Sequence, residues 1–299
     1  MFKCTIHLSI LLLLFSSLDV NAVEEITPSQ VYSEARALED AINKFSKSGS
    51  SRLDPIKLFD AKPLHVYAIA TAVNEKVGIL IDIEGLPEIK RPNFPNENIQ
   101  PKDVLQLIEV IQNNILKLKP EVEFKRVIVK GKSPSDVLRI LVRINLLLDN
   151  LVDKQLSPRH LYMMTERLKK NLTYAIVQSG RKQPKSNFEL FSNVEPKDVF
   201  VNAENMFKTL MNTARLKFEL DYPDKPYYSP YNKNEIQPYH VYTITVMNIV
   251  LFNDLSRRFG IPQYKNVYLP VSSSMTLAHI YAEYERILFL TYFFIMQNE

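Results

Sequence analysis

Cysteine, glycine and tryptophan are scarce in this chain: its 299 residues include one cysteine, six glycines and no tryptophan. A single cysteine excludes a disulfide framework, a site built from several thiolates and a haem attached through C-x-x-C-H. The six glycines form neither G-x-G-x-x-G nor a P-loop, which argues against a glycine-rich phosphate-binding loop. The sequence also lacks a nucleophile elbow, H-E-x-x-H and paired-carboxylate signatures, so we expect no catalytic residues, metal or cofactor.

An excess of one charge is missing as well, because 37 basic residues oppose 33 acidic ones. A net charge of +4 over this length does not indicate a nucleic-acid partner. The chain is otherwise 46% apolar and 23% charged, which is typical of a globular protein and excludes disorder of the whole chain. No segment shows the alternation of apolar and polar residues that is typical of a strand.

The N-terminus has the features of a secretory signal peptide. Lys3 precedes a short apolar run over residues 6–15, and Val20-Asn21-Ala22 provides small or apolar residues before a cut. The run is too short to span a bilayer. We therefore expect residues 1–22 to be removed and the mature chain to be periplasmic or secreted, with no transmembrane segment.

A short pattern recurs eight times: a cap residue, proline, any residue, Gln, His or Asp, a branched apolar residue, and Tyr, Leu or Phe. Its prolines are Pro28, Pro63, Pro101, Pro134, Pro158, Pro196 and Pro238, and Leu277 replaces proline in the eighth copy. Proline is favoured at the first position of a helix, and Ser or Thr before it can cap the helix. Two residues after the proline, a polar side chain can reach back to the backbone of the cap residue. The pattern therefore predicts eight helix starts.

Apolar residues follow each start at the spacing of an amphipathic helix. Seven and eleven positions after the branched residue, seven of the eight copies are apolar, the exceptions being Asn248 and Thr291. A constant phase between start and stripe predicts an all-α fold made of an eight-helix repeat, as a helical array or as two tandem four-helix bundles. The expected helices lie near 28–46, 63–80, 101–119, 134–153, 158–179, 196–219, 238–259 and 276–297.

The shortest connection, residues 154–157, lies at the middle of the chain. A link of this length predicts that the helices on either side are antiparallel neighbours. It divides the mature chain into a first four-helix half, 23–155, and a second, 156–299. The sequence leaves open whether the two halves pack as one domain.

Four of the five histidines share one position of the repeat, and a tyrosine lies two residues after each. These candidate first-turn residues are His65, Tyr67, His160, Tyr162, His240, Tyr242, His279 and Tyr281. The histidines could converge on a metal or haem, or each could bond back to the cap of its own helix. If successive helices alternate in direction, the histidines form two separated pairs, which favours caps. The tyrosines are expected to pack against neighbouring loops.

The connection 221–231 is the strongest candidate for a recognition surface. It contains Tyr222, Tyr227, Tyr228 and Tyr231 together with three prolines. Proline stiffens the chain and tyrosine offers a large amphipathic contact area, as in recognition loops. The alternative is an ordered loop folded over the end of a bundle.

A second polar feature is Asn248, which with Thr245 interrupts an apolar stripe and could set register or contact a ligand.

These observations predict a non-enzymatic binding or scaffold protein for a peptide or protein partner, because stacked helices form extended surfaces. The first alternative is a small-ligand carrier or sensory bundle, with a cavity lined by Thr245, Asn248 and the His/Tyr first turns. The second alternative is an exported hydrolase whose site is assembled from scattered residues.

Overall fold

The computed structural model describes residues 25–45, 60–89, 91–185, 187–220, 226, 235–264 and 274–298. The described residues form eight helices and no strand, which confirms the all-α prediction. The helices are α2 (Pro28–Phe45), α3 (Pro63–Ile83), α4 (Pro101–Leu118), α5 (Pro134–Val152), α6 (Pro158–Gln178), α7 (Pro196–Phe218), α8 (Pro238–Arg258) and α9 (Leu277–Gln297). None of these described helices is both long enough and apolar enough to cross a bilayer.

The first turns of the helices share one hydrogen-bonding arrangement. In α5, the backbone N–H of Ser133 donates to Asp136 over 3.0 Å, and in α3 the N–H of Lys62 donates to His65 Nδ1 over 3.0 Å. The side chain at the third helical position thus binds a backbone donor that the helix itself leaves unpaired. Glutamine does the same in α2, where Thr27 N–H donates to Gln30 over 2.7 Å.

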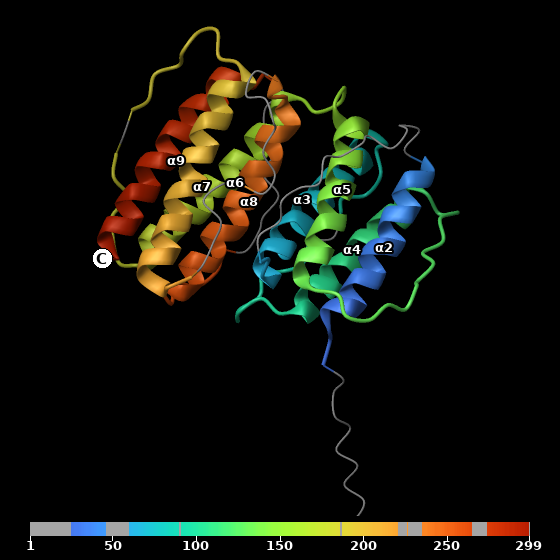
Figure 1. Ribbon diagram of the computed structural model, residues 1–299. Helices are drawn as coiled ribbons and strands as arrows, with labels where there is room; N and C mark the ends of the chain where they lie inside the picture. The colour runs from blue at the N-terminus through green and yellow to red at the C-terminus, as the bar shows by residue number, and fades with distance from the viewer. Residues whose placement is uncertain are drawn as a thin grey trace, which may run out of the picture.

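The helices form two bundles of four (Figure 1): α2–α5 form the first bundle and α6–α9 form the second. In the first bundle, α2 and α3 each pack against both α4 and α5. In the second bundle, α6 and α7 each pack against both α8 and α9. Both bundles therefore have the same arrangement of helices, with the first two lying diagonally across from each other.

Within each bundle all helices run in the same direction. Pro28, Pro63, Pro101 and Pro134 line one small hollow, so the four helix starts of the first bundle meet at one end. In the second bundle, Asn202 and Thr209 of α7 bond to Glu285 and Tyr292 of α9, in the same order along both helices. The chain must therefore return the length of a helix between successive helices, about 30 Å, which explains the long connections. The alternating direction considered from the sequence is wrong.

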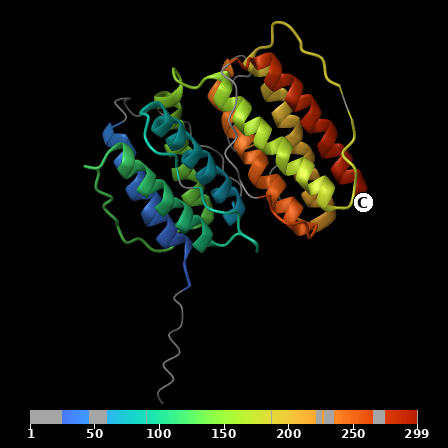
Figure 2. The ribbon, with the colours of Figure 1, turned by 180° about the vertical axis from the view of Figure 1, so that it is seen from behind.

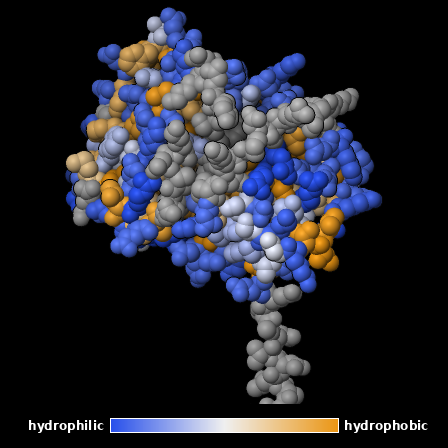
Figure 3. All heavy atoms as spheres, in the orientation of Figure 1, coloured by the Kyte–Doolittle hydropathy of each residue, from blue (hydrophilic) through white to orange (hydrophobic). Residues whose placement is uncertain are grey.

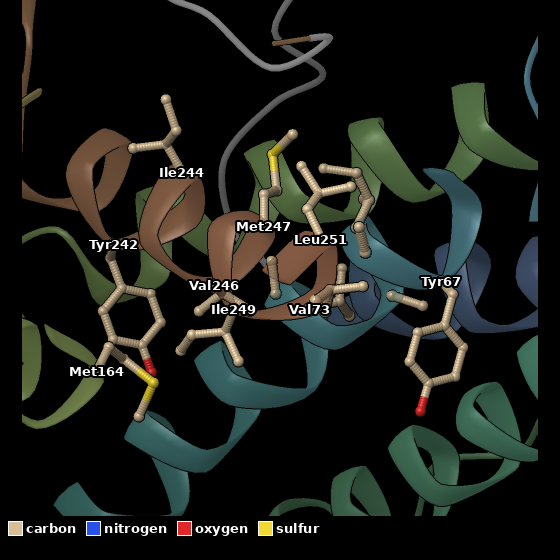
Figure 4. Packing of buried hydrophobic residues seen from close by; sticks show 14 of the residues in the cluster. Tyr67, Val73, Met164, Tyr242, Ile244, Val246, Met247, Ile249 and Leu251 are labelled. Atoms are coloured by element: carbon tan, nitrogen blue, oxygen red, sulfur yellow. The ribbon is translucent and has the colours of Figure 1, made fainter. Parts of the chain in front are cut away.

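The two bundles meet through α3 and α8 (Figure 2). Both helices are buried around most of their circumference, because each faces its own bundle and the other one. Figure 4 shows this contact, with Val73 of α3 among Val246, Ile249 and Leu251 of α8.

The link over residues 154–157 joins the bundles. Helix α5 packs mainly against α3 and α2, whereas α6 packs mainly against α9 and α8. The expectation that α5 and α6 would be close neighbours is therefore not met. A short link fixes where the next helix begins but not which helices then cover its apolar face.

Candidate binding site between the two bundles

A pocket of about 140 Å³ lies where the two bundles meet. It opens beside the C-terminal half of α3 and is completed by the connection after α3, the first two turns of α6 and the start of α8. Its lining residues are Glu75, Gly78, Ile79, Ile81, Asp82, Leu86, Glu88, Ile89, Arg91, His160, Met163, Met164 and Tyr242. Pockets at such junctions are common ligand sites.

Gly78 allows the connection after α3 to lie directly on the helix. A Cβ atom at this position would be 2.8 Å from Cδ1 of Ile89, closer than carbon atoms normally approach. Ile89 is buried at this contact. Ile89, Glu88 and Arg91 of this connection all line the pocket.

A buried carboxylate forms the inner wall of the pocket. Glu75 of α3 accepts hydrogen bonds from Arg91 Nε over 2.9 Å and from Arg167 Nη1 over 3.0 Å. Desolvation by burial raises the pKa of Glu75, but the two guanidinium groups outweigh it and hold the pKa below its ordinary value. Since Arg167 belongs to α6, this ionised group links the two bundles.

His160 provides a neutral donor at the opposite side of the pocket. Its Nδ1 accepts a hydrogen bond from Ser157 N–H over 3.2 Å, which leaves Nε2 as the protonated nitrogen. Nε2 lies 3.6 Å from Oδ2 of Asp82 on α3. Desolvation by burial lowers the pKa of His160, even though Asp82 opposes this shift. At neutral pH the pair is therefore an imidazole N–H beside a carboxylate.

The remaining wall is apolar and adaptable. Met163 and Met164 come from α6, and Figure 4 shows Met164 beside the ring of Tyr242. Methionine side chains are flexible and polarisable, so they accommodate different shapes. Asp82 and Glu88 are 61% and 52% exposed and lie at the mouth, where Glu88 also pairs with Arg91. The three carboxylates are opposed by Arg91 of the lining and by Arg167, which binds Glu75, so the site has a net charge of −1 and suits a cationic head on an apolar stem.

The structure brings only some of the predicted first-turn residues to this site. His160 and Tyr242 line the pocket. Tyr67 lines a smaller cavity of about 30 Å³ on the other side of Glu75, together with Arg91 and Arg167.

The other first-turn residues bond within their own helices, except Tyr281, which packs against the connection before α7. Tyr162 donates to Glu166 over 3.1 Å, and the ring of Tyr281 packs edge-on against Phe191 at 5.6 Å. His240 and His279 each accept the N–H of the cap residue of their helix.

The four histidines do not form the two pairs considered from the sequence. His65 lies at the start of α3 in the first bundle, and the other three histidines lie at the starts of α6, α8 and α9 in the second bundle. Burial lowers the pKa of His65 to about 3 and that of His240 to about 4. Among the residues that the structure describes, no three His, Cys, Asp or Glu side chains lie close enough to share a metal ion.

Two other predicted features lie away from the pocket. Tyr222, Tyr227, Tyr228 and Tyr231 are outside the described residues. Asn248 donates to the carbonyl of Ala203 over 2.9 Å, and Thr245 bonds to the hydroxyl of Tyr284. Both side chains are fully buried inside the second bundle, and neither is among the residues that line the pocket between the bundles.

Sequence reasoning missed the buried charges of α3. Glu75 and Lys76 interrupt a run from Pro63 to Ile81 that carries no other acidic or basic residue except His65. Lys76 is fully buried, where it bonds to Asp149 and, over 2.8 Å, to Asn145 of α5. Two adjacent charges within an apolar helix were the available signal, because buried charges require partners.

Comparison with known proteins provides no assignment. No family model matches the chain, and the searches of curated proteins and of solved structures found no significant similarity.

Proposed function

We propose that this chain is an exported, non-enzymatic binding protein for a peptide or protein partner, built from an eight-helix repeat. In this proposal, residues 1–22 form a cleaved signal peptide, and 23–155 and 156–299 are two repeated halves. Each helix is opened by the pattern of cap residue, proline, any residue, and Asp, His or Gln. The shared helix arrangement of the two bundles supports a repeated four-helix unit.

The pocket between the bundles is the observation that carries the proposal. Its volume of about 140 Å³ is below the roughly 300–1,000 Å³ of sites for drug-sized ligands. It suits one inserted side chain better than a large cofactor. Asp82 and Glu88 at the mouth and Met163 and Met164 on the wall complement a lysine or arginine side chain of a partner.

The chemistry of the lining supports a binding role over hydrolysis. His160 and Asp82 are adjacent, but serine, threonine and cysteine are absent from the described lining of this pocket. Nδ1 of His160 is occupied by the cap of α6, and Glu75 is occupied by two arginines. A nucleophile activated by a base, which is the minimum for a covalent hydrolase mechanism, is not assembled here.

The small size of the pocket favours a second candidate function, the carriage of a small organic amine. Both candidates use the same carboxylates and the same methionine wall. They differ in whether backbone contacts around the inserted group add affinity.

NMR titration of the protein with ¹³C-labelled methionine methyl groups tests both functions. The probes are acetyl-Gly-Lys-Gly-amide, acetyl-Gly-Glu-Gly-amide and butylammonium. We expect the lysine peptide to shift the methyl signals of Met163 and Met164, and the glutamate peptide to leave them unchanged. Butylammonium binding as tightly as the lysine peptide would identify a carrier, and no shift with either cation would overturn the proposal.

Substitutions at two carboxylates provide the matched control. Asp82→Asn removes a charge at the mouth and should weaken binding of the lysine peptide about tenfold, as expected for the loss of one charge-assisted contact. Asp40→Asn removes a comparably exposed charge on α2, where its partner is Arg36, and should leave binding unchanged. Equal effects of the two substitutions would place the cation elsewhere.

A further inference from the structure

The connection between α4 and α5 runs along the outside of the first bundle (Figure 1). Residues 122–130 contain no turn or bend. Three contacts hold this connection in place: Phe124 packs against the core, Arg126 pairs with Glu34 of α2, and Lys132 lies 4.8 Å from the ring centre of Tyr32. We call residues 122–132 the outer segment.

The backbone of the outer segment is not used for hydrogen bonding over most of its length. At its ends, Val122 N–H donates to the carbonyl of Lys119 and Lys132 N–H donates to Ser29 Oγ, at 3.1 and 3.0 Å. Between them, over residues 123–131, no backbone group bonds to any other part of the described chain. An extended stretch with free donors and acceptors is equivalent to the open edge of a sheet.

Apolar side chains are exposed at the centre of the outer segment and cations flank them. Ile128 is 91% exposed and Val127 is 58% exposed. The flanking cations are Lys125, Arg126, Lys130 and Lys132, and Glu123 is the one acid of the segment. Figure 3 shows hydrophobic atoms surrounded by hydrophilic ones over this connection.

We propose that the outer segment binds an extended peptide by strand addition, and that this peptide has apolar residues at its centre and acidic residues at its ends. The paired backbones would give affinity, and the side chains on either side would give specificity. Four cations against Glu123 and Glu34 leave a net charge of +2 along this surface, which complements acidic ends, and Val127 and Ile128 complement an apolar centre.

This surface is separate from the pocket between the bundles. Its contacts are with α2, which packs against α4 and α5. The pocket is lined by α3, the connection after α3, α6 and α8. The two proposals therefore stand or fall independently.

Binding of a labelled peptide to the complete chain tests this inference. The probe is an eight-residue peptide with two glutamates at each end and alternating valine and threonine between them, followed by fluorescence anisotropy. A matched peptide carries an N-methyl group on each of the four central residues, which removes backbone donors from both edges of the peptide while keeping the charges. We expect the first peptide to bind at least tenfold more tightly than the second.

Two proline substitutions locate the backbone contact. Successive N–H groups of an extended chain point to opposite edges, so Val127→Pro and Ile128→Pro remove donors from different edges. One of them should weaken binding at least tenfold and the other should have little effect. Circular dichroism should show an unchanged melting temperature for both, since these donors have no partner in the described fold.

Several results would overturn the proposal. Equal binding of the N-methylated peptide would show that the attraction is electrostatic alone. Unchanged binding in both proline variants would place the peptide elsewhere. Binding of the protein to vesicles of anionic phospholipid, with no binding of the peptide, would identify a membrane surface as the partner of these cations.

Discussion

Arg167 on α6 donates a hydrogen bond over 3.0 Å to Glu75 on α3, and so joins the two bundles through a carboxylate that is 1% exposed. Arg91, from the connection after α3, binds the same carboxylate through Nε and Nη2. The carboxylate needs its two guanidinium partners, because it is too deeply buried to be solvated by water when they are removed. The network therefore couples the stability of the bundle interface to one side chain.

Replacing Glu75 by glutamine should lower the free energy of unfolding by about 3–5 kcal/mol, since two largely buried guanidinium groups lose the carboxylate that they share. Urea denaturation followed by circular dichroism measures this loss. Glu88→Gln is the control, because Glu88 pairs with Arg91 but is 52% exposed. Its effect should stay below about 1 kcal/mol. Similar losses in both variants would mean that the network contributes no more than a surface ion pair.

The pair formed by Lys76 and Asp149 can be tested by a double-mutant cycle. Each side chain is almost fully buried, so Asp149→Asn alone should destabilise the first bundle by about 3–5 kcal/mol. Substituting Lys76→Met and Asp149→Leu together should recover most of this loss, because apolar residues of similar size replace a desolvated ion pair. A double variant less stable than either single variant would show that the surroundings require charge.

Acidification should destabilise the protein through its buried histidines. The pKa of His65 is lowered to about 3 and that of His240 to about 4, so the unfolded chain binds protons below pH 6.5 that the folded chain does not bind. Their contribution to stability is present above pH 6.5 and is lost as the pH falls toward 4. The loss is about 1.4 kcal/mol per pH unit for each histidine.

His65→Gln tests the origin of this pH dependence. Glutamine already accepts the cap N–H of α2 at Gln30, so the substitution can keep the cap bond while removing the titrating group. Urea denaturation at pH 7.5, 6.5, 5.5 and 5.0 should show a shallower fall in stability for the variant. Superimposable pH profiles of the variant and the original chain would exclude His65 as the cause.

The apolar stripe predicts which side chains maintain the core. Ile144 is fully buried, and Ile144→Ala should cost about 2–5 kcal/mol of unfolding free energy. Leu216 of α7 is 79% exposed, and Leu216→Ala should change the free energy of unfolding by less than about 0.5 kcal/mol. Thermal unfolding compares the two variants. A loss at Leu216 as large as that at Ile144 would indicate that this surface is covered by a partner.

The sequence by itself determined the local part of this structure. Proline at the first helical position and a polar side chain two residues later act within four residues of chain, so the helix starts follow from the sequence alone. The phase of the apolar stripe likewise marks Ile111 and Ile144 as core residues, and both are fully buried. Buried charges on α3 also left a signal, in Glu75 and Lys76 within an apolar helix.

Only the tertiary structure decided how the helices face one another. An amphipathic stripe specifies which face of a helix is buried, but apolar packing is non-directional and does not choose the neighbour or its direction. The long connections allow successive helices of a bundle to run in the same direction. Helices of alternating direction would instead have placed the first-turn histidines in two separated pairs. The partner of Glu75 lies 92 residues away in α6, so the meeting of Glu75 with Arg167 depends on how the bundles dock. The pocket arises at that junction because neither bundle contains all of its lining residues.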